Sequence, residues 1–188
     1  MRLDPYSDAA GGTAAALVNT VDLATGTDRM STTDDCRTLL HASGWRVDTL
    51  TSSDAARLRH IRPRLRFAFE NQEVPKVAAH LNLILLEHSA LPQLSDHDGV
   101  WHFHYSQPGD NLSARVINTC TMALAVIVSD DGLARFKTCA AQGCTNVILD
   151  VSKNRSRRFC DARTCRNRTN VSAYRDRQRK QREIDKSV

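Results

Sequence analysis

Four cysteines near the C-terminus constrain this sequence more than any other feature. They form two pairs, Cys139-Ala-Ala-Gln-Gly-Cys144 and Cys160-Asp-Ala-Arg-Thr-Cys165. Two short loops of this spacing can place four thiolates about 2.3 Å from one tetrahedral Zn²⁺, provided that a hairpin brings them together. The β-prone run 147–149 and the turn-forming residues after it favour such a hairpin. The pattern predicts a structural zinc site, because four thiolates leave no open position for catalysis.

Two other interpretations of the four cysteines stay open. Structural disulfides require an oxidising compartment, but the N-terminal residues Met-Arg-Leu-Asp carry acid where a signal peptide has its apolar run. A redox-switched zinc site, whose thiolates oxidise and release the metal, is the second. Cys36 and Cys120 stand alone inside helical patterns, and we expect both to be small buried hydrophobic residues.

The charge of the chain is divided between an acidic body and a basic tail. Residues 135–188 hold fifteen Lys and Arg against five Asp and Glu, a net of +10, within a chain of net charge +5. Residues 1–134 are therefore acidic overall. A basic segment beside a metal module is typical of nucleic-acid binding. A solvated basic tail, or one that binds RNA or an acidic protein, is the alternative.

Length and hydrophobicity suit one helical domain followed by a small metal module. A chain of 188 residues with 41% hydrophobic residues can build a domain of about 130 residues with a core of its own. We expect the division at 1–132 and 133–188. Because no run of eighteen apolar residues occurs, we expect no membrane segment and a cytoplasmic, nucleoid-associated protein.

The hydrophobic periodicity predicts a mainly α fold with a small β-hairpin. A loose entry segment is expected over residues 1–12, and a linker from the end of the domain to Thr138. Pro63 falls inside the third helical pattern, where we expect a kink or a break. The expected helices are 13–24, 34–42, 51–69, 74–88, 111–129 and 166–183, and the expected hairpin is 91–95 with 100–105.

The chain carries no nucleophile–base signature, no phosphate loop and no carboxylate pair with interpretable spacing. We therefore expect a protein that is not an enzyme. A small-molecule-binding or enzymatic N-terminal domain, with the zinc module as an accessory, is the alternative. Its candidate pocket would gather Asn19, Arg62, Trp101 and His102.

The C-terminal run resembles a known family. The segment F-C-D-A-R-T-C-R-N-R-T-N-V-S-A-Y-R-D-R, after C-A-A-Q-G-C, is similar to the CGNR zinc fingers of bacterial proteins. There the module follows a mostly helical domain, ABATE, which is assigned to stress-induced transcription regulation. Residues 16–20 and the Leu58-Arg59…Arg62 segment look like parts of that domain. The resemblance implies that the four cysteines bind zinc, and it also points to Asn167 and Arg168. The glycine of the motif is replaced by Arg166.

The last predicted helix begins beside the second cysteine pair. We expect Thr164 to cap it, and Val171 and Tyr174 to pack on the zinc lobe and fix its direction. The interpretation is a DNA-binding transcription regulator whose N-terminal domain senses a small-molecule effector or forms a homodimer. The candidate nucleic-acid contacts are Lys153, Arg155, Arg157, Arg158, Arg166, Asn167, Arg168, Arg175, Arg179 and Arg182.

Overall fold

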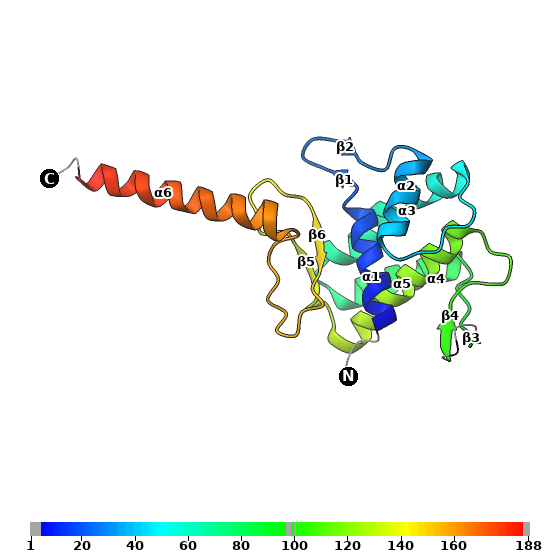
Figure 1. Ribbon diagram of the computed structural model, residues 1–188. Helices are drawn as coiled ribbons and strands as arrows, with labels where there is room; N and C mark the ends of the chain where they lie inside the picture. The colour runs from blue at the N-terminus through cyan, green and yellow to red at the C-terminus, as the bar shows by residue number, and fades with distance from the viewer. Residues whose placement is uncertain (1–4, 97–98, 100, 186–188) are drawn as a thin grey trace.

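The fold is mainly α-helical, as expected, with short antiparallel hairpins at its edges (Figure 1). A computed structural model describes residues 5–96, 99 and 101–185. The helices are α1 (Pro5–Val18), α2 (Thr33–Ala42), α3 (Ser52–Glu70), α4 (Val74–Glu87), α5 (Leu112–Asp131) and α6 (Asn167–Asp185). The hairpins are β1 (Val21–Asp22) with β2 (Thr27–Asp28), β3 (Gln93–Ser95) with β4 (His102–His104), and β5 (Phe136–Thr138) with β6 (Val147–Leu149).

The central helices start and continue for identifiable chemical reasons. Thr32 and Thr51 cap α2 and α3 through reciprocal capping boxes with the aspartate three residues on. The helix α3 runs through Pro63 without the break that we considered. Proline lacks the N–H that would bond the carbonyl of Arg59, and the Arg62 Nε donates to that oxygen instead, at 3.0 Å. A neighbouring side chain thus satisfies the freed carbonyl.

The helix α5 forms the centre of the hydrophobic core. It packs against α1, α3 and α4, and its buried positions recur around most of its surface. By length and composition α5 could cross a membrane, but 67% of that apolar window is buried inside the fold. The core therefore accounts for its apolar character. Cys36 and Cys120 are fully buried, as expected.

The N-terminal helix departs from the prediction. It begins at Pro5, where we expected a loose segment, and it ends at Val18 because the chain then turns into β1. The start of the helix was predicted too late because Gly11 and Gly12, which lie inside α1, are residues typical of a loop. A Cβ at Gly11 would lie 2.5 Å from Leu149 Cδ2, so this glycine allows β6 to approach the helix closely.

The strand β6 is shared between two hydrophobic clusters. Val147 and Leu149 belong to the main core, whereas Ile148 packs with the cysteines. This alternation follows from the two-residue period of a strand. Its partner β5 lies where we expected a linker. The hairpin therefore forms between β6 and a strand before Cys139, and not between β6 and the residues that lead into Cys160.

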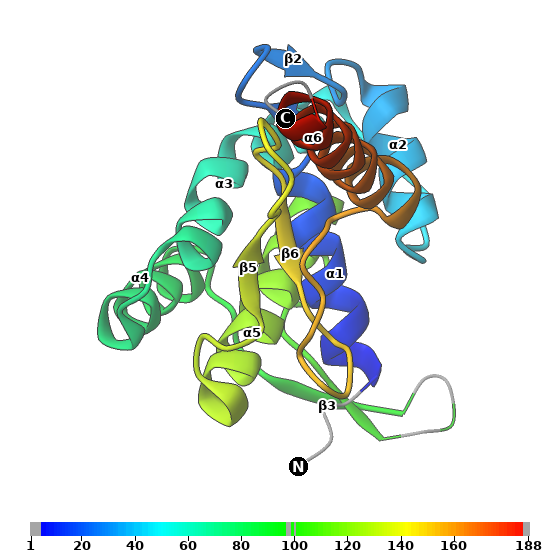
Figure 2. The ribbon, with the colours of Figure 1, turned by 90° about the vertical axis from the view of Figure 1, so that its left-hand side faces the viewer.

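The helix α6 projects away from the body (Figures 1 and 2). It makes its close contacts with η1 (Ala162–Arg166), the single π-helical turn that precedes it. Val171 and Tyr174 are 47% and 56% exposed. The prediction that they pack on the zinc lobe is therefore wrong, because α6 leaves the module too soon for them to reach it.

Candidate metal centre and basic helix

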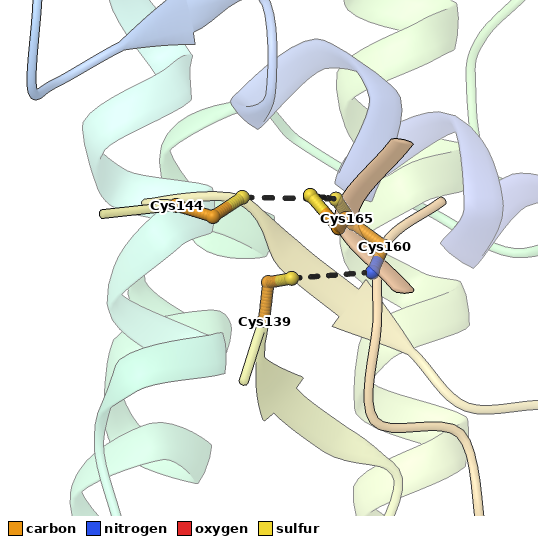
Figure 3. Close-up of side chains that lie close together, drawn as sticks. All are labelled: Cys139, Cys144, Cys160 and Cys165. Carbon is orange, nitrogen blue, oxygen red and sulfur yellow. Dashed lines mark hydrogen bonds between the residues drawn. The ribbon is translucent and has the colours of Figure 1, made fainter. Parts of the chain in front are cut away.

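The four cysteine sulfurs converge on one point (Figure 3). All of them lie within 4.8 Å of one another. The Cys160 Sγ is 3.7 Å from the Cys144 Sγ and 3.5 Å from the Cys165 Sγ. Four sulfurs at about 2.3 Å from a tetrahedral Zn²⁺ would be separated by about 3.8 Å. The cluster is therefore a candidate metal site whose donor set and spacing fit zinc.

The β5–β6 hairpin and the loops that carry the two cysteine pairs position these sulfurs. Cys139 directly follows β5, and Gly143 takes a φ of 72° so that the chain can turn sharply into Cys144. The Ala140 N–H donates to the carbonyl of Arg158 at 2.8 Å, which holds the first loop against the approach to the second. The hairpin and this bond together bring the two cysteine pairs to the same place.

The second pair is fixed by an aspartate rather than by Thr164. The Asp161 carboxylate accepts the N–H groups of Arg163 and Thr164, and these bonds lower its pKa below the ordinary value. Cys165 then lies inside the π turn and not at a helix cap. The expectation for Thr164 was wrong because the helical turn already begins at Asp161, so Thr164 lies inside the turn and its own N–H is one of the groups that Asp161 caps.

Two N–H groups point at sulfurs in the cluster. The Cys160 backbone N–H lies 3.4 Å from the Cys139 Sγ, and the Asn146 Nδ2 lies 3.3 Å from the Cys160 Sγ. Asn146 was not identified from the sequence, although an asparagine two residues after Cys144 offers a donor there. Burial and the neighbouring sulfurs raise the pKa of Cys165 to about 12. A cation is what lets such crowded thiols ionise together.

The fold and the cysteine cluster define a helical protein that carries a C-terminal zinc-finger-type module. The comparisons agree with this class. Residues 11–132 match the ABATE family, described as a putative stress-induced transcription regulator, and residues 135–178 match the CGNR zinc finger. The chain therefore belongs to the ABATE family, with a CGNR zinc finger after that domain. A search of curated proteins finds no match.

The four predicted pocket residues are not gathered into one site. The Asn19 side chain bonds both backbone polar groups of Val147, and so joins α1 to β6. Arg62 forms a bidentate ion pair with Asp28 at 2.7 and 2.8 Å. Both residues hold the fold together at the end of α1.

The other two pocket residues lie elsewhere in the fold. Trp101 is 66% exposed and directly precedes β4, and His102 is on that strand, within 3.0 Å of His104. In Figure 1 this hairpin and the β1–β2 hairpin, which carries Asp28, lie at opposite ends of the body.

Ion pairs separate the basic side chains of the module into two groups. Arg135 and Arg155 both pair with Asp131, and Lys137 pairs with the fully buried Asp150 at 2.6 Å. Asp150 has its pKa lowered to about 2, because bonds from Lys137 and from Ser152 outweigh the effect of burial. These three cations are paired with carboxylates of the chain itself. Arg155, one of the candidate nucleic-acid contacts, belongs to this group.

The other basic side chains that the structure describes in the module keep their charge available. No ion pair engages Lys153, Arg157, Arg158, Arg163, Arg166, Arg168, Arg175, Arg177 or Arg182 in the part of the chain that the structure describes, and Arg179 lies 4.0 Å from Asp176. Two of them also support the module. Arg157 donates to the carbonyls of Phe159 and Cys160, and Arg168 donates to the carbonyl of Gln142 at 3.3 Å. The side chain of Asn167 is exposed.

Proposed function

We propose that Cys139, Cys144, Cys160 and Cys165 bind one structural Zn²⁺, and that the module so formed holds α6 on DNA in a transcription regulator. Support for the metal comes from the convergence of the four sulfurs and from the match to a zinc-finger family. Zinc would supply no chemistry beyond fixing the loops, because the four thiolates fill its coordination shell.

One observation carries the DNA-binding role. The helix α6 leaves the body with its arginines exposed and with few acidic partners. A helix whose exposed side chains are mostly polar, and that contacts the rest of the fold only near its start, gains little from the hydrophobic effect. A polyanionic partner is therefore the natural source of its stability. Arginine is suited to that partner because its guanidinium matches phosphate oxygens.

The protein would act in the cytoplasm in association with the nucleoid, as a regulator rather than an enzyme. RNA or an acidic protein is the alternative partner. The N-terminal domain would sense an effector or form a homodimer. Leu94, Trp101 and Phe103 are exposed on the β3–β4 hairpin, so this surface is the candidate contact for either role.

A fluorescence titration of a labelled DNA duplex with the full chain tests this function. If six phosphates are neutralised, the affinity should fall about a thousandfold between 50 and 200 mM salt. Arg175→Ala should reduce the slope of log affinity against log salt by about 0.9. Arg46→Ala is the matched control, because Arg46 is an exposed arginine on the helical body. Absence of duplex binding even at low salt would refute the proposal.

A further inference from the structure

The faces of the helix α6 carry side chains of different chemical character. With about 100° of rotation per residue, the positions from Asn167 to Gln178 fall into an uncharged front, two basic flanks and a back. The positions of the flanks can be checked against contacts with the zinc module, because a different loop of the module lies beside each of them.

The first basic flank lies against the loop that precedes Cys160. Arg166 and Asn170 line a hollow of about 560 Å³ together with residues of that loop. All the charged groups around it are arginines, and the hollow is lined by Ser156, Arg157, Arg158, Phe159, Arg166 and Asn170. Arg177 continues this flank two turns further along α6. A concave surface with several guanidinium groups and no carboxylate is suited to a phosphate.

The second basic flank lies on the opposite side of the helix. Arg168, at its start, reaches the carbonyl of Gln142 in the first cysteine loop. Arg175, Arg179 and Arg182 follow within about 60° of one another when viewed down the helix axis. The two flanks are separated by roughly 170°. Arginines of η1 and α6 therefore project from both sides of this continuous helical segment.

From Asn167 to Gln178, the front of the helix, between the flanks, carries no charge. Asn167, Val171, Tyr174 and Gln178 fall within about 60° of one another and are all exposed. The back carries Thr169, the least exposed of the α6 residues with a described side chain, and Asp176. The side chains of the front thus face away from the module, while the aspartate lies behind.

We propose that α6 lies in the major groove of duplex DNA, with this front reading base edges and the flanks contacting the two phosphate backbones. The major groove is about 12 Å wide and admits one helix, whose sides then meet the two strands. Amide side chains recognise adenine, and apolar ones contact the thymine methyl group. From Asn167 to Gln178 the front extends about 16 Å, or about five base pairs.

The arginines therefore set affinity, and the uncharged residues set sequence preference. This differs from an arrangement in which a single arginine stripe does both. The inference rests on the proposed function, since it assumes that the chain binds duplex DNA. Its tests are designed to separate the loss of sequence preference from the loss of binding.

The first test begins with a selection from a random duplex library using the zinc-loaded full chain. Affinities are then measured for the enriched duplex and for a scrambled duplex of the same composition. The variant Y174A/Q178A should lower the ratio of the two affinities about tenfold or more and leave the salt slope unchanged. The variant R175A/R179A should weaken both duplexes by the same factor and reduce the slope by about 1.8.

Controls keep this test decisive. Ser172→Ala, outside the front, should leave the affinity ratio unchanged. Helical circular dichroism and zinc content should match the wild type in every variant, because the substituted side chains are exposed. If Y174A/Q178A keeps the ratio, or if selection enriches no sequence while duplexes still bind, the groove assignment is wrong and the proposed function stands. If no duplex binds, both are wrong.

A second test identifies the groove without changing the protein. Replacing purines of the enriched duplex with 7-deaza analogues removes acceptors that only the major groove presents. This replacement should weaken binding, and a minor-groove ligand such as netropsin should not displace the protein. Displacement by netropsin, with full affinity for the 7-deaza duplex, would place the helix in the minor groove and overturn the inference.

Discussion

The side-chain amide of Asn19 pairs with both backbone polar groups of Val147. The Val147 N–H donates to Oδ1 at 2.7 Å, and Nδ2 donates to the Val147 carbonyl at 2.9 Å. The two residues are 128 positions apart in the sequence. The amide at the end of α1 pairs with the free edge of β6 as the backbone of a neighbouring strand would. Arg66 adds a bond to the carbonyl of Thr145, at 2.8 Å. The hairpin that carries the cysteine loops is thereby fixed to the helical body.

Asn19→Ala should therefore destabilise the fold. Removing the amide leaves the N–H and C=O of Val147 without partners, at a cost of about 1–3 kcal/mol. Chemical denaturation should show this loss, and hydrogen exchange should show faster exchange of the Val147 amide. Asn154→Ala, at an exposed position, should change neither. Unaltered exchange at Val147 in Asn19→Ala would contradict this role.

Gly11→Ala should destabilise the protein, because the new Cβ would lie 2.5 Å from Leu149 Cδ2 and 3.1 Å from Ile127 Cδ1. Overpacking of this kind costs about 1–3 kcal/mol. The adjacent Gly12→Ala is a matched control, since nothing lies within 4 Å of its Cβ and alanine favours the helix by about 0.5–1 kcal/mol. Denaturant midpoints should move in opposite directions. A shift of both to higher denaturant would show that the Leu149 and Ile127 side chains yield to the added methyl group, and it would contradict this prediction.

Stability should decrease on acidification partly through Asp28. The hydrogen bond from Arg62 lowers the pKa of Asp28 from 3.8 to about 2. A carboxyl whose pKa is depressed by folding contributes stability that is complete above pH 3.8 and lost as the pH falls toward 2. Asp28→Asn should flatten the pH dependence of the unfolding free energy in that range. Asp48→Asn, at an exposed carboxyl, is the control, and equal pH profiles for the two variants would contradict the assignment.

Removal of the proposed zinc ion should expose four of the six thiols. Cys139, Cys144, Cys160 and Cys165 should react with a thiol reagent once a chelator has been added, while Cys36 and Cys120 stay protected because they are fully buried. The helical circular dichroism of the N-terminal domain should largely persist. Four thiols that stay unreactive after chelation, or six that react together, would contradict a separate metal-held cluster.

The fold class and the cysteine cluster could be predicted from sequence because both depend on local patterns. The spacing of the cysteine pairs sets the loops, and the helix caps at Thr32 and Thr51 follow from short side-chain rules. The comparisons confirm the resemblance to the ABATE and CGNR families. Residues 11–132 and 135–178 are the matched parts.

Features that depend on distant partners were missed. Gly11 reads as a loop residue until β6 is seen against it, and β5 reads as a linker until it pairs with β6. The role of Asn19 could not be predicted, because nothing in the sequence indicates that Val147 lies beside it. Charge counting could not separate Arg155, which Asp131 neutralises, from the available arginines on α6. The division at 1–132 and 133–188 stays a prediction.

The proposed function depends on a metal that holds a basic helix in position to bind DNA. The most direct measurement is a titration of one labelled duplex with the zinc-loaded chain and with the chelator-treated chain, at 50 mM salt. The loaded chain should bind, the depleted chain should lose binding, and added Zn²⁺ should restore it. Equal affinity of the loaded and depleted chains for the duplex would contradict a metal-dependent DNA-binding role.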